Sequence, residues 1–298
     1  MQLIESLVIT ILLSIVSFGF GGSHVGVATG SAVGSGMIGK KAAISITAMG
    51  YVIGLLLGIN IDFITGVSRP MCLLFTSSAF MLWSAITGIP ISLTHVIASS
   101  NAGCFYYTKN FLVPIIKIIE LGIWWLIATM LSLFLGFILD VMLRSWIPNN
   151  PITKMSITKI SSIILCFIVA ICIGMNNLAF LSYLTNHQYY LYIIVSSVLG
   201  ALVLGLQSIR TLGYRIYRAR FNNTLTTLIV TVIVALFATT YRVPISISYI
   251  VISALLGISL ASSPRLIMYG IILKIFIFQL LSILMALVAS IGISLIIS

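Results

Sequence analysis

The chain has 298 residues, of which 60% are hydrophobic and only 6% are charged, and its mean hydropathy is +1.25. These values exclude a soluble domain of this size and are typical of a polytopic membrane protein that keeps its membrane segments. The net charge is +11, but the basic residues lie mostly in short loops between apolar runs, as the positive-inside rule describes, so the sequence does not predict binding to nucleic acid.

A glycine-rich stretch, Gly19–Lys41, follows a first apolar run over residues 3–20. Four of its glycines recur at every fourth residue and would form one smooth stripe on a helix: Gly22, Gly26, Gly30 and Gly34. Polar residues lie between them: Ser23, His24, Thr29, Ser31 and Ser35. Two interpretations remain open, a broken helix that lines a cavity and a close helix-packing interface without a ligand.

The rest of the first half alternates spans and short polar segments. The predicted spans are residues 42–58, 71–88 and 111–143, with a loop at 59–70 that holds Asp62 and Arg69. The last of these is too long for one untilted span, because about 20 residues cross the hydrocarbon core. Lys117 and Glu120 are spaced to meet on one face of it. Pro90 begins a small, polar segment at membrane depth, PISLTHVIASSNAG.

The second half follows the same order after a polar linker at 144–157. Apolar residues 158–173 are interrupted by Gly174-Met175-Asn176-Asn177, and Pro244 begins the segment PISISYIVISALLG. The remaining spans are predicted at 190–206, 223–240 and 266–297, with an arginine-rich loop at 207–222.

Corresponding motifs of the two halves are separated by nearly the same number of residues. Gly21 and Gly174 are 153 positions apart, and Pro90 and Pro244 are 154 positions apart. We therefore predict an all-α membrane protein with two repeats and discontinuous helices, because paired glycine and proline interruptions indicate a transporter site. The expected organisation is repeat 1 over 1–143, a cytoplasmic linker over 144–157 and repeat 2 over 158–298, together one membrane domain.

Charge predicts that the two repeats have opposite orientations. Loop 59–70 is nearly neutral, whereas its counterpart 207–222 contains four arginines, so the two are expected on opposite sides of the membrane. With 207–222 inside, ten basic residues fall inside and Arg69, Lys109 and Arg242 fall outside, and both termini are external.

The other chemical groups give weak signals. The four cysteines, Cys72, Cys104, Cys166 and Cys172, lie in apolar segments without a CxxC pair, so they are interpreted as small buried hydrophobes and not as a disulfide framework or zinc site. His24, His95 and His187 lack metal-ligand spacing. Four scattered acids give no catalytic carboxylate pair, and no nucleophile motif is present, so an enzyme is not predicted and no cofactor is expected.

The two proline segments predict an anion site. Proline suits the first turn of a helix, whose free backbone N–H groups and dipole attract anions. Hydroxyls follow each proline within one turn: Ser92 and Thr94 after Pro90, and Ser246 and Ser248 after Pro244. The alternative is a pair of proline-kinked helices whose hydroxyls bond to their own backbone. Because the motif occurs twice beside two glycine interruptions, we favour the site.

These motifs resemble those of the inorganic phosphate transporter (PiT) family. GGSHVGVATGSAVGSG is similar to the family signature GANDVANAFGTSVGSG, and PISLTH and PISISY are similar to its PVSTTH motif. Gly174–Ala179 resembles GANDVA, and Leu212–Arg215 resembles the family's cytoplasmic segment. The resemblance covers nearly the whole chain in the right order. It implies an inverted-repeat carrier that takes up phosphate with sodium or protons, some members being associated with sulfate.

The chain departs from the family at the residues linked to cation binding. The Asn-Asp pair of the family aligns with Ser23-His24 and Asn176-Asn177, and its second asparagine with Val27 and Phe180. The motif histidine is kept as His95 and replaced by Tyr249. Because both aspartates are absent, the coupling ion stays open between H⁺ and Na⁺. His24, which titrates near physiological pH, is a candidate proton carrier together with His95, or else a neutral hydrogen-bonded histidine.

The sequence thus predicts secondary active transport of inorganic phosphate by alternating access. The expected substrate-binding residues are Ser23, Thr29, Ser31, Ser92, Thr94, Asn176, Asn177, Ser246 and Ser248, with His24 and His95 for the coupling ion. The alternatives are a permease for sulfate or another oxyanion and a transport-inactive membrane subunit. The expected setting is a prokaryotic plasma membrane, with membrane lipid around the chain and a homodimer as an option.

Overall fold

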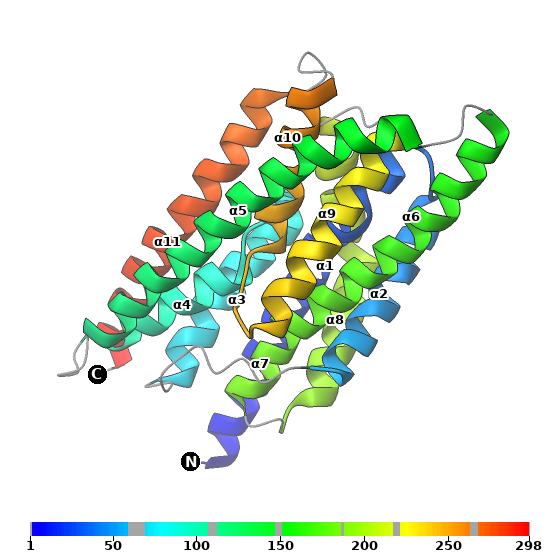
Figure 1. The fold of residues 1–298 in the computed structure, drawn as a ribbon. Coiled ribbons are helices and arrows are strands. Elements are labelled where there is room, and N and C mark those ends of the chain that lie inside the picture. The colour runs from blue at the N-terminus through cyan, green and yellow to red at the C-terminus, as the bar shows by residue number, and fades with distance from the viewer. Residues whose placement is uncertain are drawn as a thin grey trace.

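The computed structural model describes residues 2–58, 69–106, 112–146, 151–185, 188–216, 221–262 and 268–297, and every regular element within them is helical (Figure 1). The first half contains α1 (Gln2–Gly34), α2 (Lys40–Leu56), α3 (Pro70–Thr87), α4 (Leu93–Cys104) and α5 (Leu112–Trp146). The second half contains α6 (Pro151–Ile173), η1 (Gly174–Leu178), α7 (Ala179–Leu184), α8 (Tyr190–Ile209), η2 (Arg210–Arg215), α9 (Phe221–Thr240), α10 (Ile247–Ser262) and α11 (Tyr269–Ile297), where η1 and η2 are π-helical turns.

Seven helical stretches in the described part of the chain are long and apolar enough to cross a membrane, which identifies a multi-pass membrane protein. Two helices differ from these because they are short and lie inside the bundle. All residues of α4 are buried, and α10 is buried along nearly its whole length. A helix of 12 residues is about 18 Å long, so α4 is too short to span the hydrocarbon core by itself.

The helices of the two halves pack against one another. Helix α1 packs along α8, and α2 packs along α6. The short helix α4 lies against α11, and the short helix α10 lies against α5, as Figure 1 also shows. Within each half, α1 contacts α3 and α6 contacts α9. The core is therefore shared between the halves and is not divided into two separate bundles.

The glycine stripe of α1 is a close packing interface. A Cβ atom at Gly22 would meet Leu204 of α8, and one at Gly26 would meet the Ser208 backbone. At Gly34 it would meet the Gly213 carbonyl of η2. The Ser208 hydroxyl accepts a hydrogen bond from the Gly26 N–H at 2.9 Å and donates one to the Gly22 carbonyl at 2.9 Å. Of the two interpretations of the glycine stripe, the structure therefore supports the close packing interface.

The glycine interruptions do not break the helices. Helix α1 is continuous from Gln2 to Gly34, so the expected break near Gly19 is wrong. Helix α6 continues through η1 into α7, which makes the second interruption a π-helical turn. A continuous helix satisfies its own backbone groups, and glycine then serves to bring the neighbouring helix close.

Other predicted boundaries also shift. The linker expected at 144–157 is shorter, because α5 ends at Trp146 and α6 begins at Pro151, a favoured first-turn position for proline. The loop expected at 207–222 begins as helix, since α8 runs to Ile209 and η2 follows it. Lys117 and Glu120 form the predicted ion pair, with a distance of 2.7 Å between Nζ and Oε2.

Some predicted features lie outside the described residues. These are most of the loop 59–70 with Asp62, the linker residues 147–150, and the residues Lys109, His187, Arg218, Arg220 and Arg265.

The glycine interface gives a direct test of the packing. In Gly26→Ala the added methyl group meets the Ser208 backbone, which cannot move aside like a flexible side chain, so the variant should unfold at a lower temperature than wild type. The matched control is Gly122→Ala on α5, where a Cβ meets nothing within 4 Å and alanine is the better helix former by up to about 1 kcal/mol. Equal unfolding midpoints for the two variants in detergent would contradict the close α1–α8 contact.

Candidate functional site

Two non-helical connections, each with one proline, enter the middle of the bundle. The first proline segment, residues 88–95, consists of the connection 88–92 between α3 and α4 and the first turn of α4. The second proline segment, residues 241–249, consists of the connection 241–246 between α9 and α10 and the first turn of α10. Neither proline occupies the first helical turn, so that expectation is wrong. Ser92 is the N-cap of α4, and its Oγ accepts a hydrogen bond from the His95 N–H at 3.5 Å. The serine hydroxyl satisfies a free N–H group, which the side chain of proline cannot do because it has no acceptor. Each proline lies three positions before the first residue of its helix.

The hydroxyls predicted for the site form one buried pair after each proline. Ser92 Oγ lies 2.8 Å from Thr94 Oγ1, and Ser246 Oγ lies 3.0 Å from Ser248 Oγ. None of the four side chains is more than 4% exposed. In this conformation the hydroxyls bond to each other, so a ligand would reach them only after the surrounding helices open.

Gln279 of α11 joins the two proline segments. Its Nε2 donates a hydrogen bond to the Pro90 carbonyl at 3.0 Å and another to Ser248 Oγ at 3.0 Å. The side chain is fully buried, and its Oε1 has no hydrogen-bonding partner among the described residues. One amide group thus holds the two predicted motifs together, 154 positions apart in the sequence, and still offers a free acceptor.

Trp125 of α5 makes a second connection between the segments. Its Nε1 donates to the Pro244 carbonyl at 3.1 Å, and its ring lies 3.8 Å from the His95 ring, centroid to centroid. The His95 ring also lies 5.2 Å from the Tyr249 ring. His95 and Tyr249, which align with the same position of the family motif, therefore meet in the structure.

His95 is enclosed by these rings. Its side chain is fully buried, and within the described chain neither ring nitrogen makes a hydrogen bond of good geometry, although the backbone of Gln279 lies beside the ring. A buried polar ring without firm partners is unusual in a folded protein and is expected where a ligand or ion binds.

Asn176 connects the π-helical turn η1 to the second proline segment. Its Nδ2 donates to the Val243 carbonyl at 3.2 Å, and its Oδ1 accepts from the Ile245 N–H at 3.3 Å. Asn177 instead bonds within its own helix, from Nδ2 to the Ile173 carbonyl at 3.5 Å. Asn176 thus lies at the predicted site, and its amide fixes the backbone on both sides of Pro244.

The predicted residues of α1 form a separate group. Ser23 Oγ lies 2.7 Å from His24 Nδ1, and the His24 ring stacks on Phe20 at a centroid distance of 4.1 Å. Thr29 donates to the Val25 carbonyl of its own helix. The Ser31 carbonyl accepts from Thr224 of α9. All four predicted residues are buried, but their bonds run within α1 or toward α9 and do not join them to the proline segments.

Sequence reasoning missed two groups that the structure brings to the proline segments and two buried hydroxyls farther along α4 and α10. Gln279 and Trp125 lie in apolar runs, and no spacing pattern distinguishes them from packing residues. Ser99 and Ser253 each lie nine positions after a proline, at Pro90 and Pro244, and both have buried hydroxyls without a hydrogen-bonding partner in the described structure. Because both serines lie at the same distance from their prolines, an alignment of the two repeats could have identified them.

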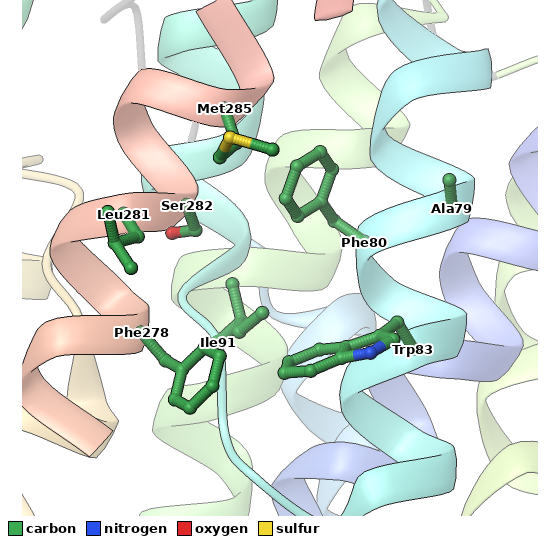
Figure 2. Close-up of a pocket in the computed structure, with 8 residues that line it drawn as sticks. All are labelled: Ala79, Phe80, Trp83, Ile91, Phe278, Leu281, Ser282 and Met285. Atoms are coloured by element: carbon green, nitrogen blue, oxygen red, sulfur yellow. The ribbon is translucent and has the colours of Figure 1, made fainter. Parts of the chain in front are cut away.

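A cavity of about 410 Å³ lies outside this polar group, between α3 and α11. Figure 2 shows its lining, in which Phe80 and Trp83 face Phe278 and Met285, and Ile91 of the first proline segment lies between Phe278 and Trp83. Ser282 is the one polar residue that lines it, and its hydroxyl donates to the Gln279 carbonyl. This apolar cavity has the wrong chemistry for an anion.

The groups at the proline segments can bind an oxyanion. Hydroxyls and amide N–H groups donate hydrogen bonds, and each proline leads into the first turn of a helix, whose backbone N–H groups favour anions. The acids described by the structure lie elsewhere. Glu5 is in the first turn of α1, Glu120 pairs with Lys117, and Asp140 lies about 22 Å along α5 from Trp125.

Comparison with known proteins finds likeness in the fold alone. No family model matches the sequence, and no curated protein matches it. Among solved structures, the chain is similar to one described as the sodium-dependent phosphate transporter, with a TM-score of 0.79 and 16% sequence identity over 98% of each chain. The match confirms, at the level of the fold, the resemblance that the motifs indicated.

The bridging role of Gln279 gives a testable prediction. Gln279→Ala leaves the Pro90 carbonyl and the Ser248 hydroxyl without this donor, which should cost about 1–3 kcal/mol of stability because both acceptors are buried. Thermal unfolding in detergent would measure the loss. The control is Gln207→Ala on the exposed face of α8, which should leave the midpoint within about 1 °C of wild type. A Gln279→Ala midpoint equal to that of the control would show that the bridge does not hold the segments.

Proposed function

We propose that the chain is a diverged phosphate transporter of the PiT type, working by alternating access in a cell membrane. The observation that carries this proposal is the meeting of the two matched proline segments through Gln279 and Trp125, within a fold like that of a sodium-dependent phosphate transporter. A transporter-like fold also favours a carrier over an enzyme.

The helix packing supports two inverted repeats with discontinuous helices at the prolines. In this arrangement α1 corresponds to the stretch from α6 through η1 to α7. Helices α2, α3, α4 and α5 then correspond to α8, α9, α10 and α11. Each of the main contacts between the halves then has a counterpart. The α1–α8 contact corresponds to α6–α2, and α4–α11 corresponds to α10–α5. Exchange of equivalent partners is what a pseudo-two-fold axis between the repeats requires. Residues 1–143 and 158–298 would then be the two repeats of one membrane domain.

Substrate recognition in this proposal uses neutral donors from both repeats. Thr94 and Ser92 come from one repeat, and Ser246, Ser248 and Asn176 from the other. Hydrogen bonds from hydroxyl and amide groups to a charged phosphate oxygen are worth more than bonds between neutral partners. The remaining predicted residues, which lie on α1 and η1, are Ser23, Thr29, Ser31 and Asn177. They would contribute only in a conformation in which α1 and η1 face the same substrate cavity as the proline segments.

Proton coupling fits the residues better than sodium coupling of the usual kind. Both positions of the family's aspartates hold neutral or basic side chains, Ser23-His24 and Asn176-Asn177. Sodium prefers oxygen ligands with negative charge, whereas an imidazole can accept and release a proton near neutral pH. His24 is buried at membrane depth beside Ser23, and His95 lies against the second proline segment through Tyr249. We propose these two histidines as the proton carriers.

Two other functions would use the same fold. Sulfate has the tetrahedral shape of phosphate and could occupy the same donors. A transport-inactive membrane subunit would explain the lost aspartates, but it would not explain why the paired hydroxyls, Asn176 and the bridge through Gln279 are kept together.

Uptake in proteoliposomes tests the proposed function. Purified protein should accumulate labelled phosphate in preference to labelled sulfate when an inward proton gradient is imposed. Thr94→Ala and Ser246→Ala should each lower uptake by about tenfold or more, because each removes one donor to a charged ligand. Ser45→Ala, which alters an exposed hydroxyl of α2, should leave uptake unchanged. Folded protein that moves neither anion under proton or sodium gradients would instead indicate the inactive subunit.

The proton role of His24 has its own test. Wild-type uptake should rise as the external pH falls, and His24→Gln should remain folded and lose that dependence, because glutamine can replace a hydrogen bond but cannot carry a proton. The measurement is the initial rate of phosphate uptake across a series of external pH values. An active His24→Gln variant with the wild-type pH profile would show that His24 is a neutral structural residue.

A further inference from the structure

Cys72 and Cys104 form a close pair that the proposed transport function does not use. Their Sγ atoms lie 2.7 Å apart, and both side chains are buried. In the structure all four cysteines are free thiols, and Cys166 and Cys172 lie separately on α6. The sequence placed the four in one class of small buried hydrophobes, because a separation of 32 residues between Cys72 and Cys104 gives no local motif.

The pair lies at one end of the bundle. Cys72 is in the first turn of α3, and Cys104 is the last residue of α4. The chain turns at the first proline segment, and α4 brings it back to the end of the bundle where α3 began. The end of α11 covers the pair. Cys72 Sγ donates to the Ser290 carbonyl at 3.3 Å, and the guanidinium of Arg69 donates to the Ser294 carbonyl at 2.8 Å.

Charge assigns this end to the external side of the membrane. Gly34 at the end of α1 lies against Gly213 of η2, so Arg210 and Arg215 of η2 lie near Lys40 and Lys41 at the start of α2. The C-terminal end of α11, which covers the cysteines, lies at the opposite end of the bundle (Figure 1). Arg69 lies at the end where the cysteines lie, and Lys109 and Arg242 are the other two bases that the sequence predicts on that side. The positive-inside rule places the more basic end in the cytoplasm, so the thiol pair faces the compartment in which disulfides form and persist.

We propose that Cys72 and Cys104 form an intramolecular disulfide that closes the α3–α4 hairpin on the external side. The two thiols lose two protons and two electrons, and an S–S bond forms between them. The electron pair reduces the disulfide of a thiol oxidant in that compartment to two thiols. The exchange passes through a mixed disulfide, which the second cysteine thiolate then attacks to release the reduced oxidant.

The order of the chain gives the oxidant access. In the folded protein the pair is covered by α11, the last helix of the sequence. During insertion α3 and α4 are present before α11, so both thiols are exposed to the oxidant until α11 packs over them. Once covered, the bond is also shielded from reductants.

The disulfide would fix the end of the hairpin that carries the first proline segment. It would connect the first turn of α3 to the end of α4, whose beginning holds Thr94 and His95. With both ends of the hairpin connected to each other, α4 could move only together with α3. The hairpin would then act as one rigid unit, and this inference does not depend on which anion is transported.

Thiol counting tests the disulfide in the wild-type chain. The protein is produced in a bacterial inner membrane. Before extraction, the sample is treated with acid and a maleimide, which block the free thiols. The protein is then reduced, and the cysteines that were not blocked are counted by their reaction with polyethylene-glycol maleimide. Two cysteines should be labelled after reduction and none without it. If all four cysteines are blocked at the first step, so that reduction exposes none, the proposal is overturned.

Two variants identify which cysteines are joined. Cys166→Ala with Cys172→Ala should still show two cysteines labelled after reduction. Cys72→Ser should show none, because Cys104 then stays a free thiol that is blocked at the first step. A non-reducing gel distinguishes a bond within one chain from one between two chains. A dimer that disappears on reduction would overturn the intramolecular assignment.

Discussion

The arrangement of the centre depends on one buried amide, that of Gln279. Its two N–H groups bond to the Pro90 carbonyl and the Ser248 hydroxyl, which belong to segments 154 positions apart. Inside a membrane protein, an unpaired carbonyl costs several kcal/mol, so each segment needs a donor from outside its own helix. Gln279 supplies it, and Trp125 does the same for the Pro244 carbonyl. The non-helical backbone that could receive an anion is stable because these two side chains complete its hydrogen bonds.

Around this centre, glycine sets how closely the helices approach. The Gly26 backbone and the Ser208 hydroxyl are in direct contact, so α1 and α8 behave as one packed pair. The short helices α4 and α10 occupy the interior between the long ones and are held by α11 and α5. The structure therefore combines rigid helix pairs with a polar centre in which the hydroxyls are paired with each other. Such an arrangement suits a carrier, since rigid units can move around a site whose internal bonds are easily exchanged for bonds to a ligand.

Most of the helices and the two proline segments could be predicted from the sequence, because hydropathy and turn residues report directly on membrane depth. The continuity of α1 could not, since Gly22 to Gly34 look the same whether they break a helix or allow a neighbour to approach. The expected position of Pro90 in the first turn of a helix was also wrong. Ser92 is the N-cap of α4 instead, because its hydroxyl accepts a hydrogen bond from a free N–H group and proline has no such acceptor. Gln279 and Trp125 were missed because their roles come from tertiary contacts between distant segments. Ser23 and His24 were predicted as site residues, but the sequence could not show that they are buried and bond to each other.

The central claim is that the two proline segments together form one anion site. Equilibrium binding of labelled phosphate to the purified protein in detergent tests it most directly, with wild type compared with Thr94→Ala in one segment and Ser246→Ala in the other. We expect one phosphate per chain, with both variants weakening that single binding event. Loss of half the binding capacity in each variant would indicate two independent sites, and the absence of saturable binding by folded wild type would mean that the segments form none; either result would contradict this account.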